Sequence, residues 1–237
     1  MTSSKIEWTD STWNPITGCS KISLGCQNCY AERMANRLRS MGMYRYRNGF
    51  AVTIHEDLFD QPLRWKSPRT IFVNSMSDLF HETVPSGIIV QLFDIMRKCD
   101  RHTFQILTKR AERIQEISKG ISWPKNVWMG VTVEAEDYMH RIEMLKNIPA
   151  TVKFISFEPL LSSIDARHSL KGIDWVIVGG ESGPNSRPME AGWARQIRAI
   201  AERDGAAFFF KQWGGINKKK AGRLLDGKLY DAMPSLT

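Results

Sequence analysis

Three of the four cysteines in the sequence lie close enough together to share one metal centre. Cys19, Cys26 and Cys29 are separated by six and then by two residues, and Gly18 and Gly25 directly precede two of them. Glycine permits the close turns that fold such a loop back on itself. Thiolate ligands suit zinc or iron–sulfur chemistry rather than calcium or magnesium. The spacing therefore predicts a zinc or an iron–sulfur site.

The fourth ligand distinguishes these two kinds of site. A structural zinc site normally has four protein ligands, usually in two closely spaced pairs, and no second CxxC or HxxxH motif follows the cluster. His55, His81 and Cys99 are the remaining candidates, but Cys99 follows a predicted helix and is expected to be a buried core residue. A catalytic [4Fe–4S] cluster needs an open coordination position. Three cysteines without a fourth ligand imply such an open position, and this favours catalysis. A structural zinc site completed by a histidine is the alternative.

The composition indicates a folded protein with an anionic partner. The chain has 237 residues, of which 42% are hydrophobic and 24% charged, and its net charge is +8. Such a charge favours nucleic acid as the partner. No apolar run is long enough to span a membrane, and the first residues lack the apolar core of a signal peptide. We therefore expect a cytoplasmic protein without a membrane partner. In that compartment the clustered cysteines are expected to bind a metal rather than to form disulfides.

Short apolar runs alternate with helical patterns along the chain. The runs predict strands at Ser11–Ile16, Ala51–His55, Thr70–Asn74, Thr103–Thr108, Val127–Val133, Val152–Ser156, Trp175–Gly179 and Ala206–Lys211. Apolar spacing predicts helices at Gly87–Lys98, Ala111–Ile117, Tyr138–Ile148 and Trp193–Arg203. This alternation indicates an α/β fold with a parallel sheet buried on both faces. A partial or complete (β/α) TIM-like barrel is expected, with a doubly wound sheet as the alternative.

Domain organisation and the position of the site follow from the same alternation. No linker-like stretch interrupts it, so residues 1–216 are expected to form one barrel domain and residues 217–237 a basic C-terminal arm. Function in such folds gathers at the carboxyl ends of the strands. Ionisable residues follow most predicted strands at this edge, namely Lys109, Glu134, Glu158, Glu181 and Lys211.

A three-cysteine loop after the first strand of an α/β barrel, with Tyr30 directly after the last cysteine, resembles the radical S-adenosylmethionine (SAM) superfamily. The segments IEWTDSTWNPITGC, ILTKR, ISFEPLL and GGESGPNSRPM also resemble a small phage-associated and bacterial family found beside three-Cys-motif partner proteins. The resemblance implies that Cys19, Cys26 and Cys29 hold a [4Fe–4S] cluster whose open iron binds SAM. It also implies reductive SAM cleavage to a 5′-deoxyadenosyl radical, and a three-Cys-motif protein as a partner.

Spore photoproduct lyase-like enzymes, which repair a thymine dimer in DNA, are the functional relatives that the resemblance suggests. In the superfamily the first two cysteines are usually three residues apart, and a Gly-Gly-Glu motif after the second strand binds the SAM amino group. Here His55 and Glu56 follow the predicted second strand, and the Gly-Gly-Glu follows a late one. The cofactor-binding candidates are Tyr30, Ser75, Lys109, Glu134, Gly179, Gly180 and Glu181. Without a further cysteine on the active face, either a tyrosine would donate hydrogen or the substrate is different. Tyr138 is a possible donor, and the catalytic candidates are Tyr30, Tyr44 and Tyr46.

The segment after the cysteines combines arginines with aromatic residues. Guanidinium groups neutralise phosphates and aromatic rings stack on bases, so Arg33, Arg37, Arg45 and Arg47 are predicted to bind nucleic acid, with DNA favoured. A solvated amphipathic helix followed by a basic loop is the alternative interpretation. The sequence as a whole predicts a radical SAM lyase for DNA photoproduct repair. A zinc-dependent or structural nucleic-acid-binding protein without catalysis is the second hypothesis.

Overall fold

The computed structural model describes residues 4 and 6–234, and the chain divides into two compact units. Unit 1 comprises residues 1–22, 29–129 and 148–151. Unit 2 comprises residues 23–28, 130–147 and 152–237. Each unit has its own strands, helices and buried apolar residues, and the two are described in turn.

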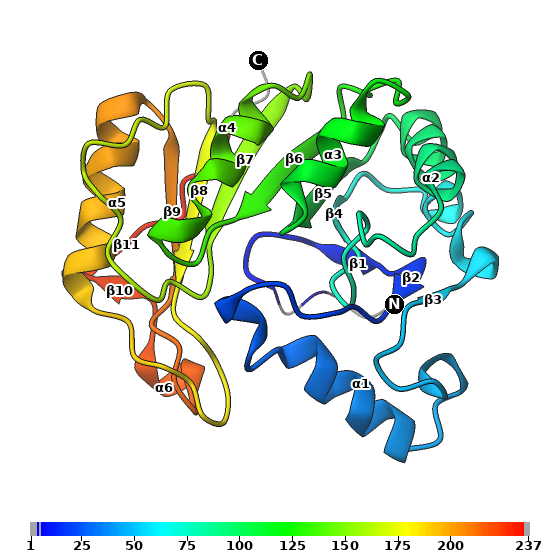
Figure 1. The fold of residues 1–237 in the computed structure, drawn as a ribbon, viewed down its shortest axis with the longest axis horizontal. Coiled ribbons are helices and arrows are strands. Elements are labelled where there is room, and N and C mark those ends of the chain that lie inside the picture. The colour runs from blue at the N-terminus through cyan, green and yellow to red at the C-terminus, as the bar shows by residue number, and fades with distance from the viewer. Residues whose placement is uncertain (1–3, 5, 235–237) are drawn as a thin grey trace. The chain divides into compact units, whose positions relative to one another are not determined.

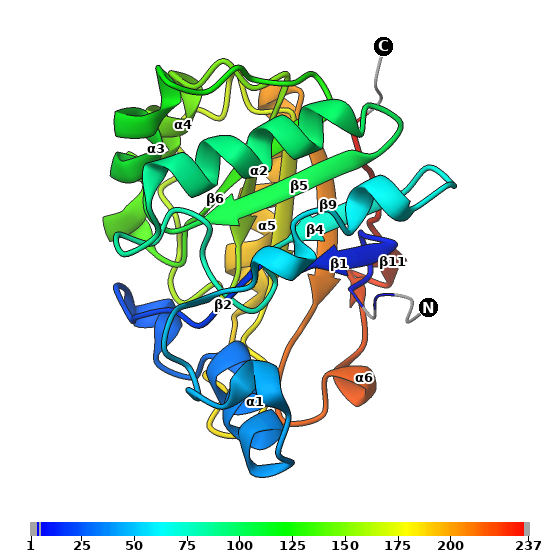
Figure 2. The ribbon, with the colours of Figure 1, turned by 90° about the vertical axis from the view of Figure 1, so that its right-hand side faces the viewer.

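Unit 1 contains a set of neighbouring parallel strands and the helices that follow them (Figure 1). The strands are β1 (Ser11–Trp13), β4 (Thr70–Val73) and β5 (Thr103–Thr108), and the helices are α1 (Tyr30–Ser40), α2 (Ser86–Lys98) and α3 (Ala111–Ser118). Phe72 of β4 is in register with Thr12 of β1 and Gln105 of β5. Figure 2 shows α2 on the connection between β4 and β5. Short 3-10 helices lie at Tyr44–Tyr46, Glu56–Leu58 and Pro62–Arg64.

A second, antiparallel pair in unit 1 corrects one sequence prediction. Strands β2 (Ile16–Thr17) and β3 (Thr53–Ile54) pair only with each other. The prediction of Ala51–His55 as a barrel strand was therefore wrong, as was the single strand over Ser11–Ile16. Pro15 explains the break, because proline has no N–H to donate in a central strand, and its carbonyl accepts a bond from the His55 N–H instead.

Unit 2 contains β7 (Val152–Phe157), β8 (Trp175–Gly179) and β9 (Ala207–Gln212), which are parallel, with α4 (His140–Lys146) and α5 (Ala191–Asp204). Ile155 is in register with Val176, and Ile177 with Phe209. Strand β6 (Val127–Thr132) begins in unit 1 and ends in unit 2. The remaining elements are the 3-10 helices η1 (Leu24–Cys26) and η5 (Glu136–Tyr138), α6 (Lys218–Ala221), and the hairpin of β10 (Leu224–Leu225) and β11 (Lys228–Leu229).

The strands confirm the predicted fold class in its partial form. Among the described residues, one seven-stranded sheet has the order β1-β4-β5-β6-β7-β8-β9. With helices in its connections, the chain is a partial (β/α) barrel. No helix in the described part of the chain has the length and apolar character needed to cross a membrane.

Burial explains why the apolar runs form central strands. All residues of β6 and β8 are buried, as expected for parallel strands covered on both faces. In unit 1, Trp13 and Phe104 pack edge to face with ring centroids 5.9 Å apart. In unit 2, the Phe154 and Trp175 rings lie 5.5 Å apart. Cys99 is fully buried, which confirms its prediction as a core residue.

Three buried histidines of unit 1 predict a loss of stability in mild acid. Burial lowers the pKa of His55, His81 and His102 below the ordinary value, because it disfavours the charged imidazole. The unfolded chain then takes up these protons first. Their contribution to stability is complete above about pH 6.5 and is lost as the pH falls through the lowered folded values. The urea concentration at the midpoint of unfolding should therefore decrease from pH 7 to pH 6 and again to pH 5.

Two variants test the cause of this pH dependence. His102→Gln removes the most deeply buried imidazole and should flatten the change between pH 7 and 5. His140 is exposed, so His140→Gln should leave the change as it is. A midpoint that is constant or rises on acidification would contradict the prediction.

Candidate functional site

The cysteine loop runs from Gly18 to Cys29, between β2 and α1. Its three cysteines are partly buried and form no disulfide. Cys26 is the last residue of η1, and Cys29 is the N-cap residue of α1. Among the described residues, no group of three or more His, Cys, Asp and Glu side chains is already gathered as a metal site. Thiols are the donors of a zinc or iron–sulfur site, and the role of the three cysteines as metal ligands stays a prediction.

The start of the loop depends on Gly18. This residue has a φ of +86°, and an added Cβ would lie 2.2 Å from the carbonyl oxygen of Ala51. The Gly18 N–H donates to the Met76 carbonyl at 3.0 Å, and the Cys19 N–H donates to the Phe50 carbonyl at 3.1 Å. Only glycine combines this conformation with this approach. Cys19 is therefore placed by backbone contacts inside unit 1.

Arg110, directly after β5, contacts the first cysteine and the residue that follows it. Its Nη1 donates to the Cys19 Sγ at 3.5 Å, and its Nη2 donates to the Ser20 Oγ at 2.9 Å. On its other side, Nε donates to Glu82 at 2.8 Å and Nη1 to Asp78 at 3.3 Å. The hydrogen bond from Arg110 lowers the pKa of Glu82 to about 2. A buried guanidinium thus links Cys19 to two carboxylates.

Asp78 is the buried anchor of this arrangement. It lies after β4, and its carboxylate accepts bonds from the Thr108 hydroxyl at 2.7 Å and the Lys109 N–H at 3.1 Å. The ends of the neighbouring strands β4 and β5 therefore hold the same carboxylate. Through its backbone, Lys109 helps to fix Arg110; its predicted role in SAM binding stays a prediction.

Unit 2 holds the middle of the loop through Glu134, which follows β6. The Ser23 hydroxyl donates to one oxygen of this carboxylate, and an added Cβ on Gly25 would lie 2.5 Å from the Glu134 side chain. The Leu24 N–H donates to the Tyr138 hydroxyl at 3.1 Å. Gly25 is therefore needed for close packing on Glu134, which gives a second structural reason for the glycines beside the cysteines.

The second oxygen of Glu134 is bound to Arg141 of α4. The Arg141 Nη1 donates to Glu134 at 2.9 Å and to the Thr132 carbonyl at 2.8 Å, and its guanidinium lies over the Tyr138 ring. Glu134 is 0% exposed and Arg141 is 3% exposed. Both carboxylate oxygens are thus engaged within unit 2, and the predicted contact of Glu134 with SAM stays a prediction.

Glu181, which follows β8, holds the same loop segment through Arg187 and Asn28. It accepts bonds from the Arg187 Nε at 2.9 Å and the Asn28 Nδ2 at 3.0 Å, while the Arg187 Nη2 also donates to the Leu24 carbonyl at 3.0 Å. Burial opposes ionisation of Glu181, but the hydrogen bonds outweigh it and its pKa is lowered. Glu181 therefore carries a charge that orders residues 24–28.

A second charged pair lies at the carboxyl ends of β7 and β9 in unit 2. The Lys211 Nζ is 3.1 Å from the Glu158 carboxylate, which also accepts a bond from the Ser156 hydroxyl at 3.1 Å. An added Cβ on Gly179 would lie 2.4 Å from Glu158, and one on Gly180 would lie 2.0 Å from the backbone after β9. The packing of the protein itself thus requires both glycines, and their predicted role at the cofactor stays a prediction.

The predicted catalytic tyrosines lie in different environments in unit 1. The Tyr30 hydroxyl donates to the Ser75 carbonyl, so these two predicted site residues are in contact. Tyr46 packs with Cys29 against the small core formed by Ala31, Ala35 and Met76, and burial raises its pKa. Tyr44, by contrast, is 74% exposed.

The predicted nucleic-acid residues differ in how far their charge is already neutralised. Arg45 forms an ion pair with Asp57 at 2.6 Å. The Arg47 guanidinium lies 4.1 Å from the centroid of the Tyr44 ring. On α1, Arg37 is exposed and Arg33 is half-buried. An aromatic ring with a stacked guanidinium is therefore presented to solvent.

The structure corrects the assignment of the residues after the second strand. Asn74 and Ser75 follow β4, the second strand of the sheet, whereas His55 and Glu56 follow β3, which lies outside the sheet. The imidazole of His55 contacts the Thr17 hydroxyl at 2.9 Å. His55 and Glu56 therefore do not follow the second strand of the sheet, contrary to the sequence prediction.

Sequence reasoning missed Arg110, Arg187 and Asn28, although each contacts the cysteine loop or its anchors. Two of them lay inside segments that had been singled out, ILTKR and GGESGPNSRPM. For Arg110, its position two residues after the end of β5 was an available signal. Their partners were not, because Arg110 and Cys19 are 91 residues apart in the sequence.

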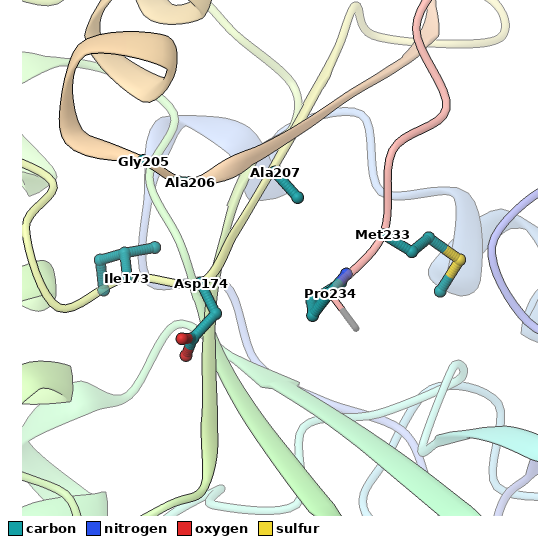
Figure 3. A pocket seen from close by; sticks show the side chains of 7 residues that line it. All are labelled: Ile173, Asp174, Gly205, Ala206, Ala207, Met233 and Pro234. Atoms are coloured by element: carbon teal, nitrogen blue, oxygen red, sulfur yellow. The ribbon is translucent and has the colours of Figure 1, made fainter. Parts of the chain in front are cut away.

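A pocket of about 490 Å³ lies elsewhere in unit 2 (Figure 3). Its lining residues are Ile173, Asp174, Gly205, Ala206, Ala207, Met233 and Pro234. These residues lie just before β8, at the start of β9 or in the C-terminal segment, whereas Glu181 follows the carboxyl end of β8. The pocket contains no predicted site residue and is not the candidate site.

Solved structures similar to the chain include spore photoproduct lyase complexed with dinucleoside spore photoproduct and a cysteine-to-serine mutant of spore photoproduct lyase. Each matches with a TM-score of 0.51 and 12% identity over 85% of this chain. The matched region spans 62% of the lyase chain in both. At this identity the likeness concerns the fold.

Among curated proteins, no sequence matches this chain. A family model described as "Protein of unknown function (DUF5131)" matches residues 3–234, which is nearly the full length. The chain therefore belongs to the DUF5131 family.

Proposed function

We propose that this protein is a radical SAM iron–sulfur enzyme that acts on nucleic acid, with repair of a thymine photoproduct in DNA as its reaction. One observation carries the proposal. A loop with three cysteines follows the first strand of a partial (β/α) barrel whose fold is shared with spore photoproduct lyase. The polar ends of the later strands supply further contacts to that loop.

The chemistry of the donors fits a [4Fe–4S] cluster. Cys19, Cys26 and Cys29 would hold three irons and leave the fourth open for SAM. The bound cluster supplies the electron for reductive cleavage of SAM to a 5′-deoxyadenosyl radical. In unit 1 Arg110 would hold Cys19, and in unit 2 Glu134 would hold Ser23, three residues before Cys26. Tyr30, exposed beside Ser75, is the proposed hydrogen donor.

Metal analysis and a cleavage assay test the proposal together. The purified protein is reconstituted anaerobically with iron and sulfide, then given SAM and dithionite. We expect a brown protein with about four irons per chain, as one cubane cluster requires, that releases 5′-deoxyadenosine. A colourless protein that keeps one tightly bound zinc and cleaves no SAM would support the structural zinc site and overturn the proposal.

The surface around Tyr44 supports a nucleic-acid substrate. An exposed ring can stack on an unpaired base, and the guanidinium of Arg47 beside it can neutralise a phosphate. The charge of Arg45 is already paired with Asp57. Tyr44 and Arg47 are therefore the proposed contacts, and Arg45 contributes less than its position in the sequence suggests.

Substitutions at this surface should distinguish the contributions of Arg45 and Arg47 to DNA binding. Tyr44→Ala and Arg47→Ala should each weaken binding of single-stranded DNA, Tyr44→Ala by about 1–3 kcal/mol, the usual contribution of one stacked base. Arg47→Ala should also reduce the salt dependence of binding. Fluorescence anisotropy with a labelled oligonucleotide at several salt concentrations measures both effects.

Arg45→Ala is the matched control, since it removes a neighbouring arginine that is paired with Asp57. It should change affinity less than Arg47→Ala. Equal losses for Arg45→Ala and Arg47→Ala, or no loss for Tyr44→Ala, would exclude this surface as the stacking site.

A further inference from the structure

Arg110 has an environment that the proposed reaction leaves unexplained. It is 6% exposed, although it lies directly after a strand at the edge where polar residues meet solvent. A buried arginine is costly unless its donors are satisfied. Its donors bind two carboxylates, Asp78 and Glu82, and the start of the cysteine loop at Cys19 and Ser20.

We infer that Arg110 is a positioning residue that raises the reduction potential of the cluster by donating a hydrogen bond to the Cys19 sulfur. This inference rests on the proposed function. The contact is already present at 3.5 Å between Nη1 and Sγ. Hydrogen bonds to cluster sulfurs are one of the means by which proteins set the potential of iron–sulfur clusters.

The surroundings hold the guanidinium in place. Asp78 binds Nη1, Glu82 binds Nε and Ser20 binds Nη2, so all three nitrogens have a partner that limits rotation. Asp78 is in turn held by the Thr108 hydroxyl and the Lys109 N–H. The N–H that faces Cys19 therefore points at the sulfur, and its partners leave the guanidinium little freedom to rotate.

The sign of the effect follows from charge. Reduction adds one electron to the cluster from a reductant such as dithionite, and the Cys19 thiolate stays bound without taking up a proton. The reduced cluster is more negative, so a charged donor at its thiolate stabilises the reduced state more than the oxidised one. Asp78 and Glu82 offset part of the charge, but the guanidinium is the group in contact with the sulfur.

Redox titration of the reconstituted protein, followed by electron paramagnetic resonance, tests the inference. Arg110→Met keeps an unbranched apolar stem and removes both the charge and the hydrogen-bond donors. At a fixed potential, it should lower the ratio of reduced to oxidised cluster about tenfold, which corresponds to about 59 mV for a one-electron couple. Arg110→Lys keeps the charge but loses the planar set of guanidinium N–H donors. It should lower the ratio of reduced to oxidised cluster by less than Arg110→Met does.

Arg97→Gln is the matched control, because it also removes one positive charge but from an exposed ion pair on α2. It should leave the titration unchanged. Arg110→Lys keeps Asp78 and Glu82 paired with a cation, so it decides the question if Arg110→Met does not fold. Circular dichroism and iron content are measured for every variant.

The outcomes separate this inference from the proposed function. A wild-type protein that takes up no cluster overturns both. Clusters of equal potential in wild type and in every folded Arg110 variant overturn only the inference, and SAM cleavage then continues to support the proposed function. A folded Arg110→Lys variant that binds no iron would also overturn it, because Arg110 would then serve assembly rather than the potential.

Discussion

Replacing Cys26 by alanine is expected to abolish cluster binding and reductive SAM cleavage while the protein stays folded. Cys26 is partly buried at the end of η1, and its removal takes away one of three thiols without opening a cavity in either apolar core. Two thiolates cannot hold three irons of a [4Fe–4S] cluster. Iron content, 5′-deoxyadenosine release and the urea midpoint of the apoprotein measure the three parts of this result.

Cys99→Ala is the matched control for the loop cysteine. Cys99 is fully buried after α2, so its substitution should lower stability slightly and leave iron content and SAM cleavage as in wild type. Cys19→Ala and Cys29→Ala should behave like Cys26→Ala. If Cys26→Ala instead unfolds a zinc-containing protein, the site is structural and the radical SAM proposal fails.

The second large effect is expected from Glu134→Gln, which should destabilise the protein by about 3–5 kcal/mol, the usual cost of leaving one partner of a buried ion pair alone. Glu134 and Arg141 are both almost completely inaccessible, so the substitution leaves the Arg141 charge buried without a carboxylate partner. The Ser23 contact to the same carboxylate is weakened as well. Urea unfolding followed by circular dichroism measures the loss.

Glu143→Gln provides the comparison, because Glu143 lies on α4, the helix that carries Arg141. Its ion pair with Lys146 has similar geometry, at 2.8 Å, but the carboxylate side chain is 72% exposed. An exposed pair of this kind contributes less than about 1 kcal/mol. Equal effects of the two substitutions would show that the burial of Glu134 does not determine its contribution. Arg141→Met combined with Glu134→Gln should recover part of the lost stability, because the unpaired charge is then absent.

Several features of the fold follow from local sequence. The apolar runs predict most of the central strands, because a parallel strand covered on both faces needs apolar residues at every position, as in β6 and β8. Helices α2, α3 and α5 follow from apolar residues spaced three or four apart, because each of these helices buries one face. Pairing partners are not local: Thr53–Ile54 has strand-like residues, but only its pairing with β2 excludes it from the barrel.

The types and spacing of Cys19, Cys26 and Cys29 by themselves indicated a thiolate-bound metal, either zinc or iron–sulfur, since ligand type and sequence separation are properties of the chain. The tertiary structure alone decided which side chains hold that loop. Arg110 reaches Cys19 across 91 residues, and Glu181 reaches Asn28 across 153. Hydrogen bonds depend on distances of about 3 Å in space, and only the folded sheet brings the ends of distant strands to such distances from the loop.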